Sequence, residues 1–177
     1  MIMLNYIKNF SVNKLDDEFE PLSQEIEKQN LPNGFRQFAL YAIAELFNNI
    51  KEHSDASEVS ISAAIKDNNF SLIISDNGIG VRESYLRKGI YPKDDFSATQ
   101  FALSGLSTKE SRERGFGLYT IRKFVQGLEG VMVLGSGQAS VRIIKNQIEL
   151  TDISFQKGVK LIIETPIKEV DFYKNIE

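Results

Sequence analysis

The chain has 177 residues, of which 42% are hydrophobic and 25% charged, and its formal net charge is -3 at pH 7. This length suits one domain with a full hydrophobic core, and the composition is ordinary for a soluble globular protein. We therefore predict a single domain over residues 1–177. Its basic residues are scattered along the chain, so the sequence predicts no nucleic-acid partner and no polybasic membrane patch.

The cysteine content and the length of the apolar segments indicate in which cellular compartment the protein is expected. The sequence contains no cysteine, which excludes disulfides, thiolate metal sites and cysteine nucleophiles and is typical of a reducing environment. Lys8 and Lys14 interrupt the apolar runs of the first 18 residues, so this segment lacks the core of a secretion signal. No stretch approaches the roughly 20 apolar residues of a membrane helix. We therefore predict a cytoplasmic protein with no membrane partner.

Two helices are predicted before residue 54. Apolar residues recur at steps of three or four from Leu15 to Ile26, which predicts an amphipathic helix over residues 15–29 that stops before Pro32. The same spacing over residues 35–53, without glycine or proline, predicts a longer helix. Residues 1–33 are interpreted as a lead-in to the main body of the domain.

A β-hairpin is predicted next. Apolar and polar residues alternate over residues 59–63 and again over 70–74, and two asparagines at 68–69 offer a turn between them. The second strand runs directly into the sequence DNGIG at residues 76–80. A carboxylate and two glycines are therefore expected at the end of a strand.

The second half of the chain alternates between irregular, helical and strand-like patterns. Residues 89–114 mix glycine, proline, serine and charges without a sustained period, which predicts a mobile lid because long irregular segments usually serve function. Helical spacing resumes over residues 115–128, and β-branched runs predict strands at 131–134, 141–144 and 159–163.

These elements together predict an α/β fold of the α+β two-layer sandwich type. Its sheet is expected to be mixed but mainly antiparallel, with the helices on one face. Residues 138–157 are long enough for an extra hairpin. This hairpin is interpreted either as a partner surface or as decoration of the fold.

A polar stripe follows the longer helix. Glu45, Asn49 and His53 are spaced four residues apart, so they share one side of the helix beside its apolar faces. A polar stripe on a helix is usually no more than solvated surface. The stripe by itself therefore leaves a structural and a functional interpretation open.

The loop at residues 76–80 offers groups suited to a ligand. Asp76 supplies a carboxylate acceptor at a strand end, and Gly78 and Gly80 allow positive φ and close approach of the backbone to a ligand. The same residues are also compatible with an ordinary turn. Neither interpretation is preferred from this loop alone.

A pair of glycines opens the third helix. Gly115 and Gly117 precede Leu118 at the start of the helical pattern, and a helix N-terminus exposes unpaired N–H groups that suit phosphate oxygens. The segment is neither a Walker P-loop nor a dinucleotide-binding fingerprint, because both of those motifs need other residues or a preceding strand.

The three elements in this order resemble the Bergerat-fold, or GHKL, ATPases, which include sensor histidine kinases, anti-sigma-factor serine kinases, gyrase, MutL and heat-shock chaperones. The resemblance spans about residues 35–128. It identifies the helix that carries Glu45, Asn49 and His53 with the N-box. By the resemblance Asn49 holds Mg²⁺, Glu45 positions or deprotonates an attacking hydroxyl, and His53 lies against the nucleotide. Oxygen ligands completed by substrate phosphates are what Mg²⁺ prefers.

The resemblance also assigns the base end of the site. It identifies DNGIG with the G1 box, in which Asp76 accepts the adenine amino hydrogen while Gly78 and Gly80 shape the pocket. A buried carboxylate discriminates well, because a base without that donor leaves it unpaired.

The phosphate end is assigned in the same way. Gly115, Gly117 and Leu118 are similar to the G2 box, whose backbone amides meet the phosphates. Thr108 and Lys109 are expected to reach the γ-phosphate from the lid, where the lysine would neutralise developing charge. The resemblance thus implies ATP and Mg²⁺ as ligands.

The chain departs from the family pattern at two places. Glu52 stands where kinases often carry a base, and a carboxylate facing phosphates would repel them. Gly158-Val159 resembles a Gly-Thr pair with the hydroxyl missing, which puts a water-bridged adenine contact in doubt.

The absence of a second histidine and of further domains argues against several classes of this ATPase family. His53 is the only histidine, so autophosphorylation on a histidine of this chain is not expected, and gyrase and chaperone activities need further domains. We expect a free-standing regulatory protein, either a serine/threonine protein kinase of anti-sigma-factor type or an ATP-binding, nucleotide-switched module with little catalysis. A slow ATPase is a third alternative. A regulatory partner protein is expected, as phosphoacceptor or effector, and a homodimer stays an open alternative.

Overall fold

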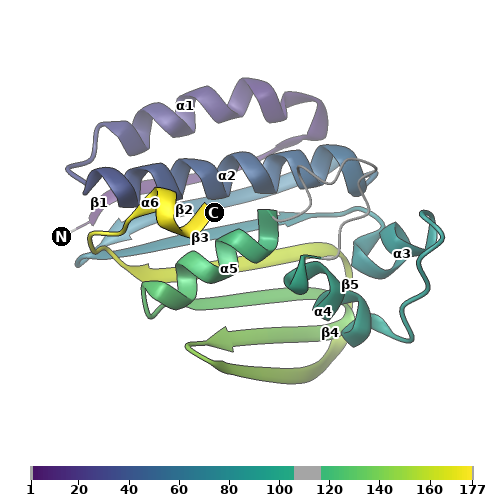
Figure 1. Ribbon diagram of the computed structural model, residues 1–177. Coiled ribbons are helices and arrows are strands. Elements are labelled where there is room, and N and C mark those ends of the chain that lie inside the picture. The colour runs from purple at the N-terminus through teal and green to yellow at the C-terminus, as the bar shows by residue number, and fades with distance from the viewer. Residues whose placement is uncertain (1, 106–116, 177) are drawn as a thin grey trace.

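A five-stranded antiparallel sheet forms one layer of the molecule (Figure 1). The computed structural model describes residues 2–105 and 117–176. The strand order is β1-β2-β3-β5-β4, and the strands are β1 (Ile2–Ser11), β2 (Glu58–Lys66), β3 (Asn69–Asp76), β4 (Val131–Ile144) and β5 (Gln147–Pro166). All four described pairings are antiparallel. The predicted fold class is confirmed, but its mixed component is not found among the described strands.

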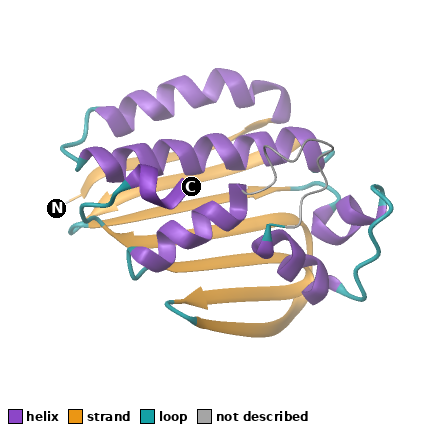
Figure 2. Ribbon diagram, in the orientation of Figure 1, coloured by secondary structure: helices purple, strands orange, loops and turns teal. Residues whose placement is uncertain are grey.

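The helices form the second layer and lie on one face of the sheet (Figure 2). A short 3-10 turn, η1 (Val12–Lys14), leads from β1 into the first of them. They are α1 (Leu15–Glu27), α2 (Asn33–His53), α3 (Gly80–Leu86), α4 (Asp95–Ser104), α5 (Gly117–Gly127) and α6 (Phe172–Ile176). The predicted helices at 15–29, 35–53 and 115–128 correspond to α1, α2 and α5, and these three predictions are confirmed. No helix of the described ranges is long and apolar enough to cross a bilayer.

The core lies between the two layers. Phe35, Phe38 and Phe124 are fully buried, and the rings of Phe38 and Phe124 join α2 to α5 at a centroid separation of 5.0 Å. Leu72 and Ile163 of the sheet are also fully buried and belong to the same core cluster. Aromatic side chains bury much apolar area each, so this cluster sets the position of α2 and α5 over the sheet.

The predicted hairpin is confirmed as β2 and β3. Its turn consists of Asp67 and Asn68, which both have positive φ. Two consecutive residues of positive φ form the turn whose twist matches that of antiparallel strands, and aspartate and asparagine tolerate this conformation. The alternation in the sequence therefore places Ile61 and Leu72 on the buried face.

The segment interpreted as a lead-in contains a strand, β1, that the sequence analysis does not predict. Residues 2–11 pair with β2 along the edge of the sheet. Leu4 and Phe10 face the helices, while Tyr6 donates a hydrogen bond to Glu18 of α1 at 2.9 Å. Asn5 and Asn9 interrupt the β-branched pattern, so tertiary contacts rather than propensity place this segment in the sheet.

The strands after α5 are longer than predicted. The Gly135-Ser136-Gly137 segment, which falls between the predicted strands at 131–134 and 141–144, lies inside β4, and the register with β5 shifts on both sides of Gly137. The extra hairpin predicted in residues 138–157 is the far end of the β4–β5 pair, with its turn after Ile144. Glycine permits the positive φ of such bulges at little cost.

Part of the segment predicted to be a lid is helical. Asp94 caps α4, since its side chain accepts a hydrogen bond from the Ser97 amide, and Gly105 ends the helix in the left-handed conformation. The apolar residues of this helix keep no sustained helical period, so the caps and the packing of α4 on β4 establish it. Residues 106–114 of the predicted lid lie outside the described residues.

Candidate functional site

The polar stripe of α2 lies beside the start of α5. Glu45, Asn49 and His53 are all half-buried. A Cβ atom on Gly117, the first residue of α5, would overlap the Glu45 carboxylate and lie 3.1 Å from its Cδ atom. The structure therefore brings together two residues that are 72 positions apart in the chain. Each of them is predicted as a site residue from a separate motif of the sequence.

A second contact supports this approach of α5 to α2. Tyr41, one turn before Glu45, forms a side-chain hydrogen bond with Thr120, one turn after the start of α5. Burial raises the pKa of Tyr41, and the nearby charge of Glu45 raises it further. The Glu45 carboxylate thus lies in a partly desolvated position close to a helix N-terminus, where the helix dipole favours negative charge.

The other end of the site is built around the Asp76 carboxylate. Asp76 ends β3 and is 8% exposed. Its Oδ1 atom accepts a hydrogen bond from the Gly78 amide at 2.8 Å, and the backbone N–H of Val159 donates to the same carboxylate. Burial raises the pKa of Asp76, and the two amide donors oppose that shift. Two backbone amides therefore hold this buried acceptor in place.

Glycines are required around this carboxylate because the backbone approaches closely. A Cβ on Gly78 would overlap the Ser54 carbonyl oxygen and lie 2.9 Å from Asp76 Oδ1. A Cβ on Gly158 would overlap the backbone of Asp76 and lie 2.7 Å from the same Oδ1. Gly158 also has a φ of +71°. Larger residues at either position would displace Asp76.

The end of α2 is fastened to the loop that carries Asp76. Ser54, directly after His53, accepts a hydrogen bond from the Ile79 amide at 2.7 Å through its carbonyl oxygen. The Asn77 side chain accepts from the amides of Ser57 and Glu58 at 3.0 Å each. These contacts hold the end of α2 that carries Asn49 and His53 next to Asp76, the candidate acceptor for adenine.

A buried serine joins a third element to the loop. Ser136 of β4 is 3% exposed; its hydroxyl accepts from the Val81 amide at 2.9 Å and donates to the Gly158 carbonyl at 2.9 Å. A Cβ on Gly80 would lie 2.8 Å from this hydroxyl. Sequence reasoning missed Ser54 and Ser136, and only the two glycines beside Ser136 hinted at a special backbone there.

The departures from the family pattern have local explanations. Glu52 is more exposed than His53, and its Oε2 atom lies 3.6 Å from His53 Nε2. The Glu52 carboxylate therefore lies beside the His53 imidazole of the same helix. Val159 contributes its backbone N–H to Asp76, which needs no side-chain hydroxyl. The Gly-Val pair therefore still serves the carboxylate, although the water-bridged contact stays untested.

The remaining predicted residues divide between described and masked positions. Leu118 is half-buried and packs against the core. Thr108, Lys109 and Gly115 lie outside the described residues. No group of three or more His, Cys, Asp or Glu within 2–105 and 117–176 is placed to hold a metal ion.

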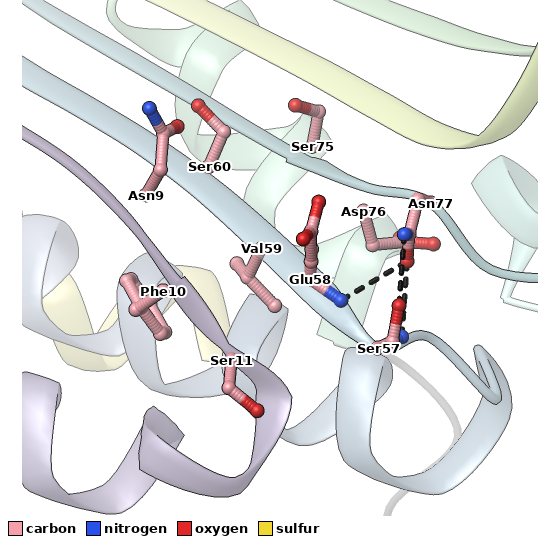
Figure 3. Close-up of a pocket in the computed structure, with 10 residues that line it drawn as sticks. All are labelled: Asn9, Phe10, Ser11, Ser57, Glu58, Val59, Ser60, Ser75, Asp76 and Asn77. Atoms are coloured by element: carbon pink, nitrogen blue, oxygen red, sulfur yellow. Dashed lines mark hydrogen bonds between the residues drawn. The ribbon is translucent and has the colours of Figure 1, made fainter.

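A hollow of about 610 Å³ opens on the sheet, and Asp76 and Asn77 are among the residues that line it. Asn9, Ser60 and Ser75 extend into it from three neighbouring strands on one side of the sheet (Figure 3). These residues alternate with buried ones along their strands, so they belong to the face opposite the helices. The hollow is therefore distinct from the Glu45–Gly117 end of the site.

Comparison with models of known protein families gives a match. The family model described as histidine kinase-, DNA gyrase B-, and HSP90-like ATPase matches residues 35–168. A comparison with curated protein sequences finds no match. The matched range begins in α2 and ends after β5, so it contains Glu45, Asn49, His53, Asp76 and Gly117.

Proposed function

The chain belongs to the histidine kinase-, DNA gyrase B-, and HSP90-like ATPases, whose domains bind ATP, and from this premise we propose that it is a regulatory protein kinase. Its reaction would transfer the γ-phosphoryl group of ATP to a serine or threonine hydroxyl of a partner protein. The partner is a regulatory protein and the setting is the cytoplasm.

The observation that carries this proposal is the approach of Glu45 to Gly117. A carboxylate is a suitable general base for a hydroxyl, and the N-terminus of an eleven-residue helix suits phosphate oxygens. A Cβ on Gly117 would overlap the Glu45 carboxylate, so the candidate general base lies close to the helix end that is the candidate phosphate site. Proton removal and phosphoryl acceptance would therefore occur within one small volume.

The described residues fit ATP and Mg²⁺. Asp76 offers a buried carboxylate acceptor for the adenine amino group, and Asn49 offers an amide oxygen between Glu45 and His53 on one side of α2. When bound, Mg²⁺ supplies charge neutralisation for the phosphates. Glu45 would take the proton from the acceptor hydroxyl as that oxygen bonds to phosphorus and the bond to the departing ADP oxygen breaks.

A nucleotide-switched module with little catalysis is the second candidate, and one contact favours it. The Asp95 carboxylate at the start of α4 accepts a hydrogen bond from the Gln138 amide at 2.8 Å. The helix inside the predicted lid segment is thus hydrogen-bonded to the extended part of the β4–β5 hairpin. A lid ordered by nucleotide would change a surface that a partner can read.

Calorimetric titration with ATP and Mg²⁺ tests the site. Asp76→Ala is expected to lower affinity by roughly 10-fold to 100-fold or more, because a charged acceptor contributes about 1.5–3 kcal/mol. Asn49→Ala is expected to remove the dependence of binding on Mg²⁺. Asn48→Ala is the matched control, since Asn48 is exposed on the adjacent position of α2 and should bind as the unmodified chain does.

Binding by the folded chain that is unchanged in Asp76→Ala would contradict the assignment of the base site. Transfer of label from γ-labelled ATP to a co-purified partner would distinguish a kinase from a nucleotide-switched module. Loss of this transfer in Glu45→Gln, with ATP binding retained, would support Glu45 as the general base. Phosphate release without a partner would favour a slow ATPase instead.

A further inference from the structure

The face of the sheet opposite the helices is uncovered in the part of the chain that the structure describes (Figure 2). Strand alternation places on it the residues between the buried ones. Two apolar side chains of the edge strand are strongly exposed there, namely Met3 at 46% and Ile7 at 65%. Exposed apolar residues on a flat, long edge call for a covering partner.

The strand register arranges this face in three rows that each cross all five strands. The central row is mainly apolar, and the two flanking rows are mainly small or polar. The central row is Ile7, Ser62, Ile73, Ile162 and Val133; one flanking row is Asn9, Ser60, Ser75, Lys160 and Gly135, and the other is Asn5, Ala64, Ser71, Glu164 and Val131.

Charges are placed symmetrically about the central row. On β5, Lys160 and Glu164 lie two positions to either side of Ile162, and both are exposed. On β2, Glu58 and Lys66 lie four positions to either side of Ser62, and both are exposed. β2 and β5 thus each carry one positive and one negative residue at equal distances from the central row.

We propose that this face pairs with the same face of a second copy, about a twofold axis that runs along the central row. Such an axis sets each strand of one copy opposite the same strand of the other copy. It also inverts the strand direction, so a residue two positions before the central row faces the residue two positions after it. Lys160 of one copy then opposes Glu164 of the other, and Glu58 opposes Lys66. A twofold interface is self-complementary by symmetry, and this charge pattern satisfies that requirement at both strands.

The uncharged positions fit the same axis. Asn9 would oppose Asn5, and Ser75 would oppose Ser71, so amide meets amide and hydroxyl meets hydroxyl. The central row places Ile73, Ile162 and Val133 near their own copies. The polar hollow of Figure 3 would be closed by the second sheet.

The size of the face suits a stable dimer. Five strands at their usual spacing and nine residues of strand length give roughly 650 Å² per copy. The pair would bury about 1,300 Å² in total, which lies within the range of specific interfaces. Two twisted sheets also pack face to face with their strands nearly aligned, and the proposed axis keeps the strands aligned.

Sedimentation equilibrium of the full chain over a concentration series tests this proposal without nucleotide, so its outcome is separate from that of the ATP experiments. The unmodified chain is expected to dimerise. Lys160→Glu is expected to raise the dissociation constant by about 100-fold or more, because it sets two glutamate pairs against each other across the interface. Glu164→Lys should do the same.

The double variant Lys160→Glu with Glu164→Lys restores opposite charges across the axis, and its dissociation constant is expected to return to within about tenfold of the original. Lys88→Glu is the control, since Lys88 is exposed beyond the end of α3. Circular dichroism confirms folding of each variant. A monomeric unmodified chain, dimers insensitive to Lys160→Glu, or a double variant that stays dissociated would each overturn the proposal.

Discussion

The two ends of the candidate site are built in different ways. At the base end, Asp76 is held by backbone amides, and the glycines around it approach backbone atoms. At the phosphate end, Gly117 approaches the tip of the Glu45 side chain. Backbone in a sheet cannot move aside, whereas a glutamate can change rotamer. A substitution at the base end should therefore damage the fold, and one at the phosphate end should damage the chemistry.

The largest effect on stability is expected for Gly158→Ala. A methyl group there would overlap the backbone of Asp76, and the positive φ adds strain. Overpacking and left-handed strain together predict a loss of about 3 kcal/mol in the free energy of unfolding, measured by urea denaturation. ATP binding should fall with it because Asp76 is displaced.

Gly89→Ala separates strain from overlap. Gly89 has a φ of +75°, and nothing lies within 4 Å of its would-be Cβ. Its expected loss is therefore only about 1 kcal/mol from the left-handed conformation. Equal losses in the two variants would show that the close approach to Asp76 contributes nothing.

A smaller and opposite effect is expected for Gly117→Ala. Alanine favours the helix over glycine by up to about 1 kcal/mol, and the Glu45 side chain can swing away from the added methyl. Stability should be kept or raised, while phosphoryl transfer or release falls by about 100-fold because the base is misplaced. Gly127→Ala shares the helix gain without any contact within 4 Å, and its activity should be unchanged. A destabilised Gly117→Ala would contradict the comparison.

The smallest effect is a pH slope that comes from the base end. The pKa of Asp76 is raised by burial in the folded state, so the native chain takes up this proton at a higher pH than the unfolded chain. The stability that this group contributes is therefore fully present below the ordinary aspartate pKa of about 3.9, and it is lost as pH rises through the folded pKa.

Urea denaturation between about pH 4 and pH 7 measures this slope. Asp76→Asn should lack the Asp76 contribution, and Asp152→Asn, at an exposed position of β5, should keep it. Indistinguishable pH profiles for the unmodified chain and Asp76→Asn would refute the burial argument.

The sequence predicted the elements that have strong local signals. The helical spacing of α1, α2 and α5 and the alternation of β2 and β3 identified five elements and the loop at residues 76–80. It did not predict β1, α4 or the continuity of β4. Those depend on pairing with β2, on caps at Asp94 and Gly105, and on a bulge at Gly137, which periodicity does not record.

For the site, the sequence alone determined which groups are available: a carboxylate, an amide and a histidine on one side of a helix, an aspartate at a strand end, and glycines before another helix. Spacing of residues within one element carries that information. Only the tertiary structure decided that Glu45 meets Gly117, that Ser54 and Ser136 fasten the loop, and that Val159 donates to Asp76. These contacts join residues far apart in the chain, and they exist because the buried aromatic core orients α2 and α5 over the sheet.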